Sequence, residues 1–308
     1  MKKMSFLTTL INGISLGSMY ALIALGYTMV YGIAKMLNFA HGDVIMIGGI
    51  TTLTIMQSLQ SAFNLPEVAC AIISMLAAVI VCTVLGVTIE KVAYKPLRQA
   101  SSLAVLITAI GVSYFLQNAA LLTFGSTKEM ITFKFLDKLT IRVNDQLTIQ
   151  GSTIVNVITM TVIMIALVLF INFTKAGTAM RAVSEDNGAA QLMGINVNGT
   201  ISLTFAIGSA LAGVAGFMFL GSYPQIGAYS GAMPGIKAFT AAVFGGIGSV
   251  PGAMIGGLTL GIIESFSRYI LTDFQLAQLT DPVVFIILIL VLLIKPSGIL
   301  GKQIKEKV

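Results

Sequence analysis

The stretch LTTLINGISLGSMYALIALGYTMVYGI, residues 7–33, contains no Asp, Glu, Lys or Arg. An α-helix needs about 20 apolar residues to cross the hydrocarbon core of a bilayer, so this run is long enough to span a membrane. Further runs of this kind occupy residues 68–89, 102–123, 153–172, 199–223 and, more briefly, 281–294. Each run is expected to be helical, because backbone groups that face lipid can be satisfied only within their own segment.

The composition of the whole chain agrees with these runs. Of 308 residues, 56% are hydrophobic and 10% are charged, and the mean hydropathy is +0.94. Water-soluble domains carry about 25% charged residues, so this chain lacks the polar surface of a soluble protein. Its net charge of +6 comes from scattered Lys and Arg, which is typical of residues that flank membrane spans and not of nucleic-acid binding. We therefore expect a polytopic protein embedded in membrane lipid.

Glycine, proline and polar residues interrupt two further apolar segments, 43–59 and 236–265. With these two, the chain has about eight apolar segments. The predicted fold class is therefore an all-α polytopic membrane helix bundle in which two segments are broken or re-entrant. Irregular backbone at membrane depth is tolerated only where protein buries it or where it lines a cavity.

The first interruption is KMLNFAHGDVIMIGG, residues 35–49. Gly42 permits a turn, and Asp43 can favour the N-terminus of the helix that follows. His41 is the only histidine of the chain. Without Cys or carboxylate ligands at suitable spacing it does not predict a metal site. We interpret Asn38 and His41 as polar residues that hold a helix break together.

The second interruption lies in KAFTAAVFGGIGSVPGAMIGGLTLGIIES, residues 237–265, where Gly248 and Gly252 are four residues apart. This spacing lets another backbone approach closely, and helix packing alone can account for the individual glycines. Pro251 lacks a backbone donor, so we expect it to break the helix between the two glycines.

Two ionisable residues, Lys237 and Glu264, flank this second break. Ionisable side chains within a membrane usually face a cavity or a partner. We therefore interpret the whole interrupted segment as functional and expect a translocation path to run past both breaks. Its candidate residues are Asn38, His41, Gly42, Asp43, Lys237, Gly248, Pro251, Gly252 and Glu264.

The polar intervals constrain the topology. The Lys and Arg residues are spread too evenly among these intervals to set the orientation alone. If residues 90–101, 173–198 and the tail from Lys295 are all cytoplasmic, residues 124–152 lie outside. An N-terminus on the inside would then require residues 35–60 to be re-entrant.

The polar interval 173–198 is long for a connection between spans. Interpreted as one helix from Gly177 to Met193, it carries Met180, Val183 and Ala190 along one side. Gly194 follows in the usual position of a helix C-terminal glycine. Two readings stay open: an amphipathic helix at the membrane interface, or a helix that docks into a groove of a partner.

Several common catalytic motifs are missing from this sequence. It has no H-E-x-x-H, no paired-cysteine motif and no Walker A sequence. Cys70 and Cys82 lie twelve residues apart in one helical run, about 18 Å, which is beyond disulfide reach. We expect no enzyme activity, no catalytic or metal-binding residues and no cofactor bound by this chain.

Three long strings carry a family resemblance: YALIALGYTMVYGIAKMLNFAHGDVIMIGG, RAVSEDNGAAQLMGIN and the string at 237–265 quoted above. EKVAYKPLR at 90–98 and PSGILG at 296–301 extend it over essentially the whole chain. Together they closely resemble the permease subunits of bacterial branched-chain amino acid ABC transporters, the LivH family.

The resemblance implies a single transmembrane permease domain over residues 1–308, in the bacterial inner membrane. It implies a second related permease, two cytoplasmic subunits that bind ATP, and a periplasmic protein that delivers leucine, isoleucine or valine. Residues 173–198 then correspond to the cytoplasmic coupling loop, whose family pattern is often E-A-A-x-x-x-G. Here Gly188 stands where the glutamate is expected. The residues implied in coupling are Arg181, Glu185, Ala189, Ala190 and Gly194.

Three other functions remain open from the sequence. The nearest is a related permease for urea, short amides or another amino acid. An ion-coupled secondary transporter would need carboxylates within the membrane, for which Glu264 and Asp43 are the candidates. A membrane scaffold without transport activity is the third.

Overall fold

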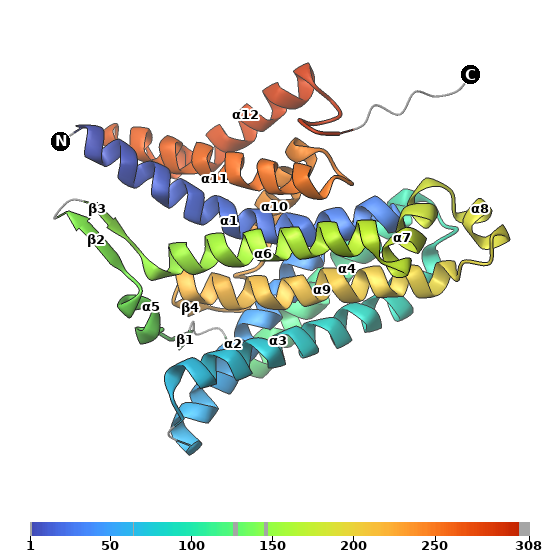
Figure 1. Cartoon of the computed structure of the whole chain (residues 1–308), viewed down its shortest axis with the longest axis horizontal. Helices are drawn as coiled ribbons and strands as arrows, with labels where there is room; N and C mark the ends of the chain where they lie inside the picture. The colour runs from blue at the N-terminus through green and yellow to red at the C-terminus, as the bar shows by residue number, and fades with distance from the viewer. Residues whose placement is uncertain (1, 64, 126–128, 145–146, 302–308) are drawn as a thin grey trace.

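The computed structural model describes residues 2–63, 65–125, 129–144 and 147–301 (Figure 1). Within this part of the chain, eight helices are long and apolar enough to cross a membrane. They are α1 (Lys2–Ala34), α2 (His41–Phe63), α3 (Glu67–Ile89, extended to Leu97 by two short helical turns), α4 (Ser102–Phe124), α6 (Gly151–Phe173), α9 (Val197–Ser222), α11 (Val250–Asp273) and α12 (Thr280–Ile294). The predicted all-α polytopic bundle is confirmed.

Helix α1 runs through the middle of the bundle, and α11 packs antiparallel along it (Figure 1). Glycines make this contact very close. A Cβ atom at Gly257 would meet the backbone of Ala21, and one at Gly13 would lie 2.9 Å from the Cα of Ile262. Gly13 and Gly257 therefore serve backbone-to-backbone packing of α1 and α11.

The bundle has two ends, which we name by the elements that lie there (Figure 1). The hairpin end holds the start of α1, α5 (Lys134–Lys138) and the paired strands β2 (Ile141–Asn144) and β3 (Leu147–Ile149). The α7 end holds α7 (Lys175–Glu185) and α8 (Asn187–Leu192).

The intervals 90–101, 173–198 and 295–301 all lie towards the α7 end, as the conditional topology requires. Glu90 bonds to Ser202 near the start of α9, and Ile299 donates to the carbonyl of Phe244. The described residues of this outer interval, 124–125, 129–144 and 147–152, lie at the opposite end together with the start of α1 (Figure 1). The N-terminal helix therefore begins on the side away from the coupling interval, and α2 crosses the bundle instead of re-entering. The tail from 302 onward lies outside the described residues.

The break expected within residues 43–59 is absent, because α2 is one continuous helix. Its glycines pack against neighbours: a Cβ at Gly48 would lie 3.1 Å from the Cα of Gly213 on α9. The irregular backbone lies before α2, at residues 35–40, where Lys35 has a positive φ of 55°. The prediction of a broken or re-entrant first segment was therefore wrong within 43–59.

The second break is present, slightly earlier than expected. Helix α10 (Ala232–Gly245) ends before residues 246–249, and α11 begins at Val250. Pro251 lies in the first turn of α11, where a missing N–H costs nothing. With 14 residues, α10 is about 21 Å long, shorter than the roughly 30 Å hydrocarbon core.

Short strands were not predicted. Besides the β2–β3 hairpin, β1 (Glu129–Met130) pairs antiparallel with β4 (Gln225–Ile226), which precedes α10. The outer helices α3, α4, α6 and α12 expose large apolar side chains, for example Leu122, which is 87% exposed. Such a surface suits contact with lipid and not with water.

Candidate functional site

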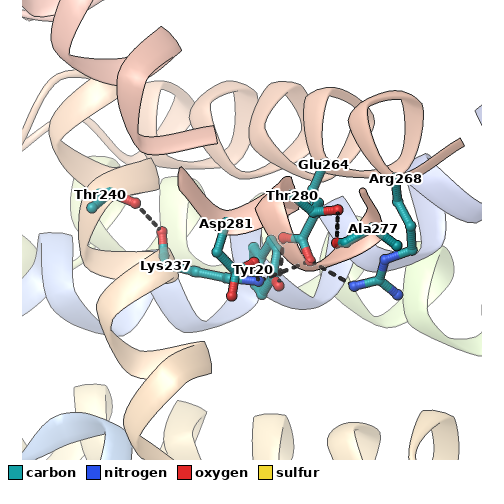
Figure 2. A network of polar contacts seen from close by, with 8 residues as sticks. All are labelled: Tyr20, Lys237, Thr240, Glu264, Arg268, Ala277, Thr280 and Asp281. Carbon is teal, nitrogen blue, oxygen red and sulfur yellow. Dashed lines mark hydrogen bonds and ion pairs between the residues drawn. The ribbon is translucent and has the colours of Figure 1, made fainter. Parts of the chain in front are cut away.

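A buried network of charges joins four helices at the side of α10 that faces α11 (Figure 2). The ammonium of Lys237 on α10 lies 2.8 Å from Oε1 of Glu264 on α11 and 2.7 Å from Oδ1 of Asp281 on α12. Arg268 donates to the same Glu264 oxygen at 3.2 Å. The Tyr20 hydroxyl on α1 donates to the other oxygen at 2.9 Å.

This network is balanced in charge, with two cations facing two carboxylates. The Lys237 and Glu264 side chains are only 8% and 2% exposed, whereas Asp281 is 38% exposed. Because an unpaired charge in such surroundings costs several kcal/mol, the network fixes α10 against α1, α11 and α12. Lys237 and Glu264, which were predicted only to flank the second break, are brought together directly.

The first break is held by polar and aromatic contacts. Asn38 accepts a hydrogen bond of 2.8 Å from the hydroxyl of Tyr94, which is fully buried. The His41 ring lies edge-on to Tyr27, with 4.7 Å between the ring centres. It fills the space left by Gly26, since a Cβ there would collide with the imidazole. Nε2 of His41 is buried without a hydrogen-bond partner among the described residues.

Asp43 turns away from this cluster towards α4. Its two carboxylate oxygens accept hydrogen bonds from Ser113, at 2.5 Å, and Gln117, at 2.9 Å. Asp43 also lies in the first turn of α2, where the partial positive charge of the helix N-terminus favours a carboxylate. The sequence-based role of Asp43 at the start of a helix is confirmed, with α4 as an additional partner.

The first break lies against α10, the half-helix that leads to the second break. A Cβ on Gly42 would collide with the backbone of Gly231 just before α10, and the rings of Phe39 and Phe239 are 5.3 Å apart. Gly42 therefore lies against α10, and Asn38 and His41 line a small pocket together with Phe239 and Ala242 of α10. Gly248 lies next to the end of α1, because a Cβ on Gly32 would be 3.0 Å from its Cα, and Pro251 and Gly252 lie in the first turn of α11.

The interval 173–198 forms two helices, so the single helix expected from Gly177 to Met193 was wrong. Asp186 separates them and caps α8, because its Oδ1 accepts from the backbone N–H groups of Gly188, at 2.7 Å, and Ala189, at 3.0 Å. Gly194 ends α8 with a positive φ of 80°, and Ile195 donates to the carbonyl of Ala190. The terminating role of Gly194 is confirmed.

The predicted inner side of this interval is confirmed as well. Met180, Val183 and Ala190 are buried, at 0%, 2% and 4% exposed. Arg181 bonds to Asn172 and Thr178, while Glu185 is exposed at the end of α7. Leu192 and Met193 are 90% and 82% exposed, so the tip of the interval presents two apolar side chains outside the bundle.

One model of a protein family matches residues 9–292, nearly the whole chain, and it describes the permease component of the branched-chain amino acid transport system. The chain belongs to this family. The high-affinity branched-chain amino acid transport system permease protein LivH of Salmonella typhimurium is 45% identical over 306 residues, covering 98% of each chain. BraD of Pseudomonas aeruginosa, of the same description, is 45% identical over 310 residues with 98% coverage of each. A probable LivH of Methanocaldococcus jannaschii is 30% identical over 292 residues, covering 94% of this chain and 90% of the relative.

Membership of this permease family, together with eight potential spans in the described part of the chain, makes this a multi-pass membrane protein. It is a transport component and not a catalytic protein. One string of the permease could suggest otherwise: Gly13–Gly17 reads G-I-S-L-G, which fits the G-x-S-x-G pattern of hydrolases. That pattern requires a strand–turn–helix context, whereas these residues lie inside α1.

Sequence reasoning missed several buried polar groups of the permease. Glu90 is fully buried, bonds to Arg98, and accepts from Ser202 on α9 at 2.6 Å. A π-helical turn, Glu90–Tyr94, aims Glu90 at α9 and Tyr94 at Asn38. The only sequence signal for this role of Glu90 is its position directly after an apolar run. The sequence alone places it at the start of the polar interval 90–101.

Proposed function

We propose that this permease is the membrane-embedded subunit of an ATP-driven importer of leucine, isoleucine and valine, located in the bacterial inner membrane. In this proposal it pairs with a second permease, two cytoplasmic subunits bind and hydrolyse ATP, and a periplasmic binding protein delivers the substrate. The observation that carries the proposal is the pair of exposed apolar residues, Leu192 and Met193, at the tip of α7–α8.

The construction of α7–α8 suits a docking element. Large apolar side chains that are almost fully exposed outside the spans usually mark a binding surface. Here the backbone beneath them is fixed at both ends, by the Asp186 cap and by the left-handed turn at Gly194. Met180 and Val183 anchor α7 in the bundle. A partner groove that accepts Leu192 and Met193 could therefore push or pull on the bundle through a rigid segment.

Alternating access requires two arrangements of the same helices. The contact between the first break and α10 is the natural place for such a change, because irregular backbone replaces continuous helix at residues 35–40. We propose that the translocation path passes the residues predicted from the sequence, with Asn38, His41 and Gly42 on one side and Lys237 and Glu264 on the other. The half-helix α10 joins the two groups.

An ion-coupled carrier is the main rival from another class of transporter. It would need a carboxylate free to bind and release its ion. Glu264 is paired with Lys237, Arg268 and Tyr20, and both oxygens of Asp43 accept hydrogen bonds. This pairing favours the ATP-driven mechanism. A related permease for urea or short amides differs only in substrate, and the uptake assay below separates the two.

The proposal is tested by changing the tip of α8. The double variant Leu192→Ser, Met193→Ser should lose co-purification with the ATP-binding subunits and reduce ATP-dependent leucine uptake at least tenfold, with the same amount of folded chain. Leu139→Ser, at an exposed position near the hairpin end, is the matched control and should keep both. Leucine uptake that persists in the double variant, or that continues after ATP depletion while a membrane potential remains, would overturn the proposal.

A further inference from the structure

A cavity of about 590 Å³, lined mainly by residues with polar side chains, opens near the hairpin end of the bundle. Four segments line it: the first half of α1, the start of α6, the end of α9 with Tyr223, and the last turns of α11. This volume lies within the range of roughly 300–1,000 Å³ that is usual for small-molecule sites. The path-lining residues proposed above contribute nothing to its wall, but Arg268 in the wall bonds to Glu264, so the cavity adjoins the proposed path.

Most of the lining residues are uncharged and polar, but one cation and one anion are among them. Hydroxyl and amide groups come from residues such as Asn12, Ser152, Ser222 and Ser265. Arg268 and Asp273 add one charge of each sign. They lie five residues apart on α11, about 7.5 Å along the helix axis. Such a wall can form hydrogen bonds and ion pairs with water and with a dipolar solute.

Arg268 has donors left for a ligand. A guanidinium carries five N–H groups, and among the described residues a single hydrogen bond, of 3.2 Å to Glu264, is made by this side chain. The Arg268 side chain is 57% exposed. Its planar fork matches the two oxygens of a carboxylate. Glu264 keeps Lys237 and Tyr20 as partners when Arg268 turns to a second carboxylate.

Leu16 and Met19 form an apolar part of the wall on α1. An aliphatic α-amino acid carries a carboxylate, an ammonium and an aliphatic side chain on a single α-carbon. We infer that this cavity binds the zwitterion of an aliphatic α-amino acid, with the α-carboxylate on Arg268, the α-ammonium on Asp273 and the side chain towards Leu16 and Met19. This inference rests on the proposed function, since it names where the permease itself holds its substrate.

Photolabelling of the purified full chain tests the inference without ATP or partners. The probe is a leucine analogue whose side chain carries a diazirine, and labelled residues are identified by mass spectrometry. We expect labels on the cavity wall, and we expect excess L-leucine to remove them. Leucinol, which lacks the carboxylate, and 4-methylpentanoate, which lacks the ammonium, should compete about tenfold less well, because each loses a charge-assisted contact.

Two variants identify the charged partners. Arg268→Gln should weaken competition by L-leucine about tenfold and leave leucinol unchanged. Asp273→Asn, at an exposed position outside the charge network, should weaken L-leucine and leave 4-methylpentanoate unchanged. Arg142→Gln, on β2 at the same end, is the control and should behave like the wild type. A purely structural role of Arg268 would weaken all competitors equally.

The inference is wrong if the probe labels residues elsewhere, or if Asp273→Asn changes competition by L-leucine and 4-methylpentanoate to the same extent. These results differ from a failure of the proposed function. A wild-type complex that imports no leucine with ATP would overturn the importer mechanism, whatever the labelling shows. Import that is normal in Arg268→Gln and Asp273→Asn would leave the importer in place and remove this cavity from its path.

Discussion

Replacing Lys237 by methionine removes the cation that Glu264 and Asp281 share. Methionine is of similar length and apolar, so the packing around the stem is kept while the charge is lost. Glu264, with a side chain only 2% exposed, is left with Arg268 at 3.2 Å and with Tyr20. Removing one partner of a buried ion pair costs about 3–5 kcal/mol. We expect a loss of stability of this order.

Two further variants separate burial from charge. Asp281→Asn breaks the other half of the network, but Asp281 is 38% exposed, so water replaces the lost contact and the cost should be about 0.2–1 kcal/mol. The double variant Lys237→Met, Glu264→Gln removes both buried charges. It should be more stable than Lys237→Met alone, because no carboxylate is then left without its ammonium.

The assay is stepwise heating of the purified full chain in detergent, with the folded fraction measured by size-exclusion chromatography. The apparent Tm should be highest for the wild type, slightly lower for Asp281→Asn, lower for the double variant and lowest for Lys237→Met. The reasoning would be refuted by a Lys237→Met variant that melts with the wild type. A double variant that melts at or below the temperature of Lys237→Met would refute it equally.

Two other substitutions probe packing and hydrogen bonding. Gly257→Leu should prevent folding, since any side chain there meets the backbone of α1. The control Gly111→Leu, which has open space around it, should express and run on size-exclusion chromatography like the wild type. Equal yields of the two variants would contradict the close packing of α1 and α11. Tyr94→Phe should lower stability by about 1–3 kcal/mol, because Asn38 loses its donor in a buried place. The exposed Tyr114→Phe is the control in the same melting assay, and equal melting temperatures would show that the Asn38 contact is not needed.

The spans were predictable because lipid leaves the backbone no alternative to a helix. The buried side of the polar interval, Met180 and Val183, followed from helical spacing, and the end at Gly194 followed from the conformation that glycine allows. These features depend on residues close together in the chain, and a single sequence contains that information.

The errors share a different physical origin. The interruptions within residues 43–59 suggested a broken helix, but the missing side chain of Gly48 makes room for α9 and the helix stays intact. Asp186 was read as part of one helix, but its side chain caps a second. Asp281, which completes the charge network, and Tyr94, which holds Asn38 from 56 residues away, act through contacts that no local pattern contains. Which of the predicted residues line the translocation path stays a prediction.

The close contact between α1 and α11 limits how the protein can change shape. Where backbones touch without intervening side chains, there are no rotamers to rearrange and no gap in which one helix can slide past the other. The two helices should therefore move as one rigid unit that runs from the hairpin end to the α7 end of the bundle. Bending must be concentrated at residues 35–40 and 246–249, which lie on the same side as α7. A small movement of these segments should therefore produce a larger displacement of α1 and α11 at the hairpin end.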